Sequence, residues 1–209
     1  MTTLPARAFP ESALNVHGAN EATVEQFARS GCRRYAEIGV YKGHTAARIA
    51  EVLGGEGEIH LFDYEDRLRP VAERLRAAGH RNVTAHPNSR RLLDSYNWSL
   101  MKVLAGHAGP AFDYVFLDGA HTWAHDALAF LLVDRLVAPG GYVDFDDYRW
   151  TLRGSPSMNP RAFPEVESLY TEEQIDARQV ALVVDLLVRP GDRYEEVVPD
   201  KVFRKRGAA

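Results

Sequence analysis

Three aspartates and one histidine in this chain could perform metal-assisted proton chemistry. Asp118 ends the apolar run Phe-Asp-Tyr-Val-Phe-Leu-Asp, and Asp146 and Asp147 end a second run, Gly-Tyr-Val-Asp-Phe-Asp-Asp. Both runs are typical of buried strands, and ligands of an open parallel sheet bind beyond the carboxyl ends of its strands. With His121 three residues after Asp118, these carboxylates form a candidate site for a hard divalent cation and a general base. Taken singly, each aspartate could also be a turn or helix-capping residue.

A glycine-bearing turn, E-x-G-x-x-x-G-x-T, follows the first predicted strand and runs from Glu37 to Thr45. Glycine lets a backbone approach a ligand closely, and the helix that follows presents free amide groups. The turn lacks the central glycine of a dinucleotide fingerprint, because Tyr41 stands there, and it lacks a P-loop ending. Glu37 would repel a phosphate but could accept hydrogen bonds from an ammonium group. Asp63, at the end of the second strand, suits ribose hydroxyls.

Four segments, taken together and in order, resemble class I S-adenosylmethionine-dependent methyltransferases. They are residues 35–45, 61–63, 112–121 and 138–147. The resemblance implies that S-adenosyl-L-methionine binds with Glu37 and Gly39 near its methionine part and Asp63 at its ribose. Asn88 and Ser89 would lie near the adenine. The full set of predicted cofactor-binding residues is Glu37, Gly39, Gly43, Thr45, Asp63, Tyr64, Asn88, Ser89 and Asp118.

Within that superfamily the sequence is most similar to metal-dependent O-methyltransferases that modify sugar or phenolic hydroxyls of microbial natural products. The shared features are D-x-x-H, here Asp118-Gly-Ala-His121, and the acidic pair Asp146-Asp147. The likeness implies that Asp118, Asp146 and Asp147 hold Mg²⁺ and that His121 is the general base, so His121, Asp118 and Asp146 are the predicted catalytic residues. Mg²⁺ takes oxygen ligands and lowers the pKa of a bound hydroxyl, which agrees with these roles. His125, one helical turn further on, is an alternative base.

Short apolar segments alternate with helical ones along most of the chain. Strands are expected at 34–40, 58–63, 82–86, 114–118 and 142–145, and helices at 21–29, 45–53, 68–78, 90–104, 123–136 and 172–188. This alternation predicts an α/β fold with a single doubly wound, mostly parallel sheet and helices on both faces. Segments 194–198 and 202–206 predict a C-terminal antiparallel hairpin. We expect one methyltransferase domain over residues 1–209, with residues 1–30 forming a lead-in and a first helix.

The stretch 149–170 breaks the alternation and contains Pro156, Pro160 and Pro164. A long irregular segment inside a compact domain is often a binding loop or lid. We therefore expect residues 149–170 to form a substrate lid. Asp144, within the fifth strand, is expected to face solvent or a helix.

The composition excludes several classes of function. Of the 209 residues, 45% are hydrophobic and 26% charged, as in an ordinary globular domain, and the net charge of −4 gives no electrostatic case for nucleic acid. The single cysteine, Cys32, excludes a disulfide framework and cysteine-rich zinc sites. No apolar run approaches a membrane span, so we expect a cytoplasmic protein without a membrane partner. Homo-oligomerisation stays open.

Three other functions remain possible from the sequence. One is a methyltransferase that needs no metal, with His121 as base. Another is an NAD-dependent oxidoreductase on a Rossmann sheet, which the missing central glycine and Glu37 argue against. The third is a non-catalytic protein that keeps the cofactor fold.

Overall fold

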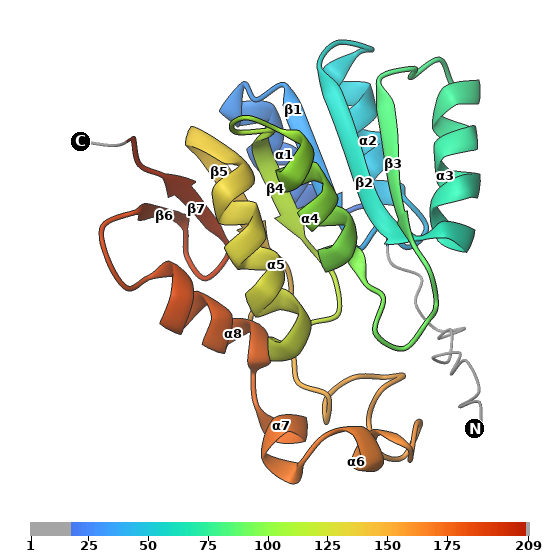
Figure 1. Cartoon of the computed structure of the whole chain (residues 1–209), viewed down its shortest axis with the longest axis vertical. Helices are drawn as coiled ribbons and strands as arrows, with labels where there is room; N and C mark the ends of the chain where they lie inside the picture. Colours follow the sequence, from blue (N-terminus) through green and yellow to red (C-terminus); the bar gives the residue numbers. More distant parts are fainter. Residues whose placement is uncertain (1–17, 208–209) are drawn as a thin grey trace.

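One sheet of seven strands forms the centre of the molecule (Figure 1). The computed structural model describes residues 18–207, so the predicted lead-in before residue 18 lies outside the described residues. The strand order is β3-β2-β1-β4-β5-β7-β6, and neighbouring strands from β3 to β5 are parallel. The strands are β1 (Arg34–Ile38), β2 (Glu58–Tyr64), β3 (Val83–Asn88), β4 (Phe112–Leu117), β5 (Val137–Phe145), β6 (Tyr194–Val198) and β7 (Val202–Lys205).

Helices cover both faces of the sheet. The main ones are α1 (Glu21–Ser30), α2 (His44–Leu53), α3 (Glu65–Ala77), α4 (Tyr96–Gly106), α5 (Trp123–Leu136) and α8 (Gln179–Val183), which continues as the π-helix η1 (Val184–Val188). Two short helices, α6 (Val166–Leu169) and α7 (Glu172–Asp176), lie between β5 and α8. None of the helices within residues 18–207 is both long and apolar enough to cross a membrane.

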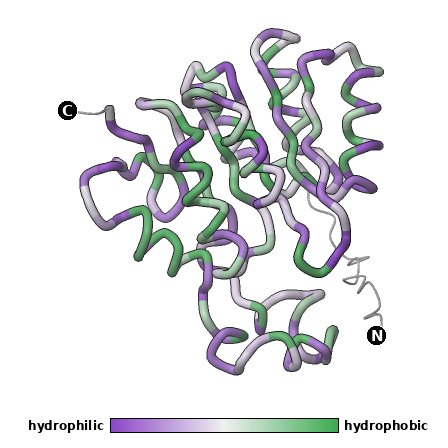
Figure 2. The backbone as a smooth tube through the Cα atoms, in the orientation of Figure 1, coloured by the Kyte–Doolittle hydropathy of each residue, from purple (hydrophilic) through white to green (hydrophobic). Residues whose placement is uncertain are grey.

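Alternate residues of the central strands feed two separate cores. Ala36 and Ile38 of β1 join the core formed with α4, α5, α8 and η1, whereas Tyr35 joins the core formed with α1, α2 and α3. This alternation follows from the two-residue period of a strand that is covered on both faces. In Figure 2 the α8–η1 segment is largely hydrophobic, and purple marks outer loops and turns of α3. The predicted doubly wound α/β sheet is therefore confirmed.

The C-terminal hairpin is also confirmed. Strand β7 pairs antiparallel with β5, with Asp144 opposite Val202, and β6 pairs antiparallel with β7. The hairpin thus extends the sheet beyond β5, which becomes an interior strand.

Two predicted helices are wrong in their extent. The helix predicted at 90–104 begins only at Tyr96, because the Ser95 hydroxyl caps it by accepting from the Asn97 amide at 3.3 Å. The helix predicted at 172–188 is divided into α7, α8 and η1. Gln179, at the break, accepts from the Trp123 amide at 2.7 Å and donates to the Gln174 carbonyl at 2.8 Å. These contacts stabilise a bend that a helical pattern does not reveal.

Backbone hydrogen bonds continue past the ends of three strands and fix their relative register. The Gly39 amide donates to the Phe62 carbonyl, the Asp118 amide to the Ile38 carbonyl, and the Asp146 amide to the Leu117 carbonyl, each at 2.9 Å. Gly39, Asp118 and Asp146 therefore lie side by side at the carboxyl edge of the sheet.

Gly39 makes the closest of these approaches. Its φ is +88°, and a Cβ built on it would lie 1.9 Å from the carbonyl oxygen of Asp118. Only glycine satisfies both the left-handed backbone and the contact with the neighbouring turn.

We expect Gly39→Ala to destabilise the protein by roughly 3 kcal/mol or more, because backbone strain and overpacking add. Gly55→Ala is the matched control, since Gly55 has φ +89° with nothing within 4 Å of a built Cβ. Its cost should be the strain alone, about 1–2 kcal/mol. Urea unfolding measures both changes, and equal losses would show that the contact with Asp118 has no energetic weight.

Candidate active site

The acidic cluster, which we define as Asp118, Asp146 and Asp147, lies at the carboxyl ends of β4 and β5. The side chains of Asp118 and Asp146 are within hydrogen-bonding reach of each other. Desolvation raises the pKa of Asp118 well above its usual range, and the charges of Asp146, Glu37 and Asp147 raise it further. The cluster therefore concentrates negative charge that needs a proton or a cation to balance it.

His121 lies between two of these carboxylates. Its Nε2 atom is 3.6 Å from Oδ1 of Asp118 and 3.7 Å from Oδ2 of Asp147. The indole of Trp150 lies 5.2 Å from the imidazole, centroid to centroid. His121 and Asp147 both have positive φ, at 55° and 57°. Non-glycine residues held in this region store strain that is common at functional sites.

His125, the alternative base, lies elsewhere. Its Nδ1 atom is 3.1 Å from the Thr122 hydroxyl, and its ring packs edge-on against Tyr96. The structure brings His121, and not His125, into contact with the acidic cluster.

The three predicted metal ligands are not gathered around one point. Within residues 18–207, no group of three or more His, Cys, Asp or Glu side chains lies in an arrangement that could hold a metal ion. Asp118 and Asp146 meet, while Asp147 faces His121. Two carboxylates are nevertheless a common protein contribution to a Mg²⁺ site, because this ion keeps several waters. The donor chemistry of the Asp118–Asp146 pair fits Mg²⁺.

Glu37 is buried inside the sheet next to the glycine turn. Its Oε2 atom accepts a hydrogen bond from the Tyr35 hydroxyl at 3.0 Å. Desolvation raises the pKa of Glu37 to about 8, with the Tyr35 hydroxyl opposing the shift and the Asp63 charge adding to it. A buried carboxyl group that holds a proton near neutral pH suits a cationic ligand group that can displace that proton.

Asp63 fixes the shape of the glycine turn. Its Oδ2 atom accepts from the amides of Val40 and Tyr41 at 2.9 and 2.8 Å, and its Oδ1 atom accepts from the Tyr64 amide at 2.7 Å. Tyr41 has a positive φ of 48°. Asp63 is thus first a structural anchor of the turn, a role that its position in the sequence did not reveal.

Most other predicted cofactor residues have partners within the protein. Gly43 caps α2 and packs against Val71, and the Thr45 hydroxyl accepts from the Asn20 amide at 3.0 Å. Ser89 donates through its amide and its hydroxyl to Asp94, at 2.7 and 2.6 Å.

Tyr64 at the end of β2 and Asn88 at the end of β3 could each contact a ligand, Tyr64 through its ring and Asn88 through its amide oxygen. The Tyr64 ring lies under the Arg90 guanidinium, 4.4 Å away. Asn88 is different, because its buried Oδ1 atom has no hydrogen-bond partner among residues 18–207. An orphaned buried acceptor at this edge is a candidate contact for a ligand donor.

Two residues at the site were missed by sequence reasoning. Asn20 donates from Nδ2 to Oδ1 of Asp146 at 2.9 Å while its own Oδ1 atom caps α1. Lys201 places its Nζ atom 3.9 Å from Oδ1 of Asp146. An asparagine before a helix signals a cap, but contacts between residues this far apart in sequence leave no local pattern.

Of the two surroundings expected for Asp144, solvent is wrong and a helix is right, because its side chain lies close to Thr23 of α1. It does not face solvent: it is fully buried, accepts from the Tyr114 hydroxyl at 2.6 Å, and forms an ion pair with Lys201 at 2.8 Å. The hairpin pairs with the edge of β5 and supplies the lysine, which explains why a charged residue is tolerated there.

The segment predicted as a lid lies beyond the carboxyl edge, where Figure 1 shows α6 and α7. Together with α7 it forms a small separate core of Leu152, Phe163, Val166 and Ile175, with Trp150 packed against it. Trp150 therefore connects this core to His121. Two arginines of the segment are held by carboxylates, Arg149 by Asp200 and Arg153 by Glu172 and Asp176.

We expect Glu37 to make stability depend on pH. Because its pKa rises from 4.5 in the unfolded chain to about 8 in the folded protein, the folded state binds the extra proton, and stability falls as pH rises through this window. Glu37→Gln keeps the shape and removes the titration. The two proteins should be about equally stable at pH 5, and the variant should be more stable at pH 8 by on the order of 3 kcal/mol. Urea unfolding at several pH values tests this, and a constant difference would refute it.

Comparisons with known proteins agree with this geometry. A family model described as a methyltransferase domain matches residues 36–148, more than half of the chain. No curated protein sequence matches.

Similar solved structures include the methyltransferase PaMTH1 of Podospora anserina bound to S-adenosylhomocysteine (SAH). It has TM-score 0.59 and 17% identity, and the match covers 90% of this chain and 77% of that chain. A Klebsiella pneumoniae protein with a suggested O-methyltransferase activity has TM-score 0.62, 17% identity, and coverage of 93% and 83%. An O-methyltransferase of Bacillus cereus in complex with SAH has TM-score 0.51, 17% identity, and coverage of 78% and 71%. At these identities the structures show the fold alone. The family model decides the assignment: this chain belongs to the methyltransferase domain family, as its motifs predict.

Proposed function

We propose that this protein transfers a methyl group from S-adenosyl-L-methionine to a hydroxyl oxygen of a small molecule, of the sugar or phenol class. One observation carries the proposal: Asp118 borders the glycine turn through Gly39 and contacts His121 on its other side. A methyl donor in the turn and a hydroxyl beside the imidazole would then lie on the two sides of Asp118.

Several features support the cofactor. Glu37 can pair with the ammonium of the methionine part, and the orphaned Asn88 oxygen can accept from the adenine amino group. Two of the similar solved structures hold SAH. S-adenosyl-L-methionine supplies an electrophilic methyl group on a sulfonium.

His121 is the proposed general base. Its Nε2 atom takes the hydroxyl proton, and the carboxylates of Asp118 and Asp147 on either side stabilise the imidazolium that forms. Imidazole suits this role because it titrates near neutral pH. The Trp150 indole beside the ring limits the access of water to the proton transfer.

The Asp118–Asp146 pair is the proposed holder of Mg²⁺, with Asp147 as a further ligand. The mutual repulsion of the two carboxylates supports a cation there. When bound, Mg²⁺ acts as a Lewis acid that lowers the pKa of the substrate hydroxyl. The segment 149–170 is the proposed substrate lid, since the core that it forms with α7 positions Trp150 against His121.

Calorimetric titration tests the cofactor. We expect the wild-type protein to bind SAH and not NAD, and we expect SAH to release up to about one proton at pH 7, because its ammonium favours ionised Glu37. The released proton appears as a dependence of the binding enthalpy on the buffer. In Glu37→Gln that dependence should disappear. If NAD bound in place of SAH, the protein would be an oxidoreductase. If SAH bound without proton release, Glu37 would not be the partner of its ammonium group.

Transfer of a labelled methyl group to catechols and deoxysugar glycosides tests the chemistry. We expect His121→Gln to lower kcat by about 10²–10⁴-fold, the range of a general base, with SAH affinity nearly unchanged. His125→Gln is the matched control and should retain most of the rate. EDTA should abolish transfer by the wild-type protein and spare SAH binding. Full activity in EDTA would leave a metal-independent methyltransferase, and an unchanged rate in His121→Gln would remove His121 from the mechanism.

A further inference from the structure

Lys201 reaches the carboxyl edge of the sheet from the C-terminal hairpin. Its Nζ atom lies 2.8 Å from Oδ1 of Asp144 and 3.9 Å from Oδ1 of Asp146. Only 20% of its side chain is exposed, whereas lysines usually keep their ammonium in water. This ammonium is therefore placed between a buried carboxylate and one member of the acidic cluster.

Both the backbone and the side chain of Lys201 are held in place. Its carbonyl accepts from the Phe145 amide at 2.8 Å, and its Nζ atom donates to the Phe145 carbonyl at 3.5 Å. The ammonium also lies 5.1 Å from the centroid of the Phe116 ring. These contacts surround the last residue of β5, directly before Asp146, so the charge has a fixed position.

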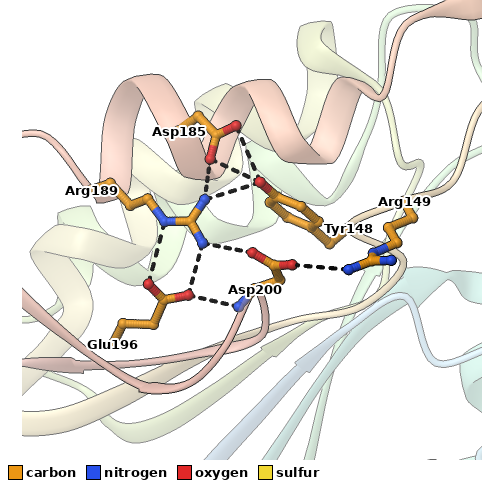
Figure 3. A network of polar contacts seen from close by, with 6 residues as sticks. All are labelled: Tyr148, Arg149, Asp185, Arg189, Glu196 and Asp200. Carbon is orange, nitrogen blue, oxygen red and sulfur yellow. Dashed lines mark hydrogen bonds and ion pairs between the residues drawn. The ribbon is translucent and has the colours of Figure 1, made fainter.

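A network around Arg189 anchors the turn that precedes Lys201 (Figure 3). The Arg189 guanidinium binds Asp200 at 2.7 Å and Glu196 at 2.7 Å, and the Asp200 amide donates to Glu196 at 2.6 Å. The same guanidinium donates to the Tyr148 hydroxyl at 3.0 Å. Tyr148 follows the acidic cluster directly, so one arginine fixes the hairpin turn and the chain that leaves the cluster.

The charges show what the ammonium does. It lies 2.8 Å from the Asp144 carboxylate and 3.9 Å from the Asp146 carboxylate, so its positive charge acts on both. An ammonium has no lone pair and cannot be a metal ligand, so its effect on a metal ion nearby is repulsion.

We propose that the Lys201 ammonium offsets negative charge of Asp144 and Asp146, and that it thereby weakens the binding of a divalent cation by the Asp118–Asp146 pair. The inference deepens the proposed function and rests on its divalent cation. Lys201 would keep the ion exchangeable, while the aspartates supply the ligands.

Binding of Mn²⁺ to the full chain, followed by its electron paramagnetic resonance signal, tests this inference without any turnover. Lys201→Met removes the charge and keeps most of the side-chain volume, so Mn²⁺ should bind about tenfold more tightly or better. Asp144→Asn should weaken binding, because the lysine charge then acts on Asp146 alone.

Lys205→Met is the matched control. Lys205 ends β7, the strand that begins directly after Lys201. Its side chain is 19% exposed, and its Nζ atom is 3.6 Å from a carboxylate oxygen of Asp134, at the opposite end of the sheet. Its replacement should leave Mn²⁺ affinity unchanged.

Lys201→Met leaves a buried carboxylate without its cation and could unfold the protein. The double variant Lys201→Met with Asp144→Asn removes both members of the ion pair. It should also bind Mn²⁺ more tightly than the wild type, because the lost charge nearest Asp146 is the ammonium. Wild-type affinity in both Lys201 variants, or tighter binding by Asp144→Asn, would overturn the inference.

SAH titration of each variant separates this inference from the proposed function. Absence of SAH binding by the wild type would refute the proposed function and leave the Mn²⁺ comparison readable. If only the Lys201 variants bind Mn²⁺, Lys201 takes the place of the ion and the metal-dependent form of the proposed function fails. If none of the proteins binds Mn²⁺, the inference is wrong.

Discussion

The contact between the backbone at Gly39 and at Asp118 holds the two parts of the candidate site together. Parallel pairing sets the ends of β1, β4 and β5 in register, and the absence of a side chain at Gly39 lets the two turns touch. Asp63 fixes the glycine turn from the other side through the amides of Val40 and Tyr41. A shift of either turn would therefore disturb the glycine turn and the acidic cluster together.

Buried carboxylates are the second constraint on the structure, because each needs a hydrogen-bond donor. Tyrosine hydroxyls supply many of these donors. Glu37, Asp126, Asp134 and Asp144 each accept a hydrogen bond from a buried tyrosine hydroxyl. A hydroxyl satisfies a buried acceptor without adding a second charge that must itself be desolvated.

Asp118 is placed differently from these four carboxylates. It contacts Asp146 and His121. The charge of Asp146 disfavours ionised Asp118, and His121 favours it only when the imidazole is protonated. Strained backbone at Tyr41, His121 and Asp147 lies at the same edge. The packing of the sheet stabilises an arrangement that these residues would not adopt alone.

The sequence was sufficient for what depends on local patterns. Apolar runs alternating with helices predicted the sheet, and their last residues, such as Asp63 and Asp118, were placed at its carboxyl edge because parallel strands end together. Contacts across long sequence separations could not be predicted. Asp144 lies between Val143 and Phe145, a pattern typical of a half-exposed strand, but α1 covers its face through Thr23 and the turn before β7 brings Lys201 to it. Asn20 and Lys201 reach Asp146 from opposite ends of the chain.

The direction of β7 explains how the end of the chain takes part in the site. A parallel strand beside β5 would bring its last residue to the carboxyl edge, whereas antiparallel β7 brings the turn before it, with Val202 opposite Asp144. Lys201, directly before β7, thus lies at the acidic cluster, and Lys205, the last residue of β7, lies near Asp134 at the other end. Exposed ion pairs such as those of Arg189 stabilise a fold weakly when isolated. Several pairs that share one guanidinium hold a single geometry, and here that geometry fixes where the ammonium of Lys201 acts.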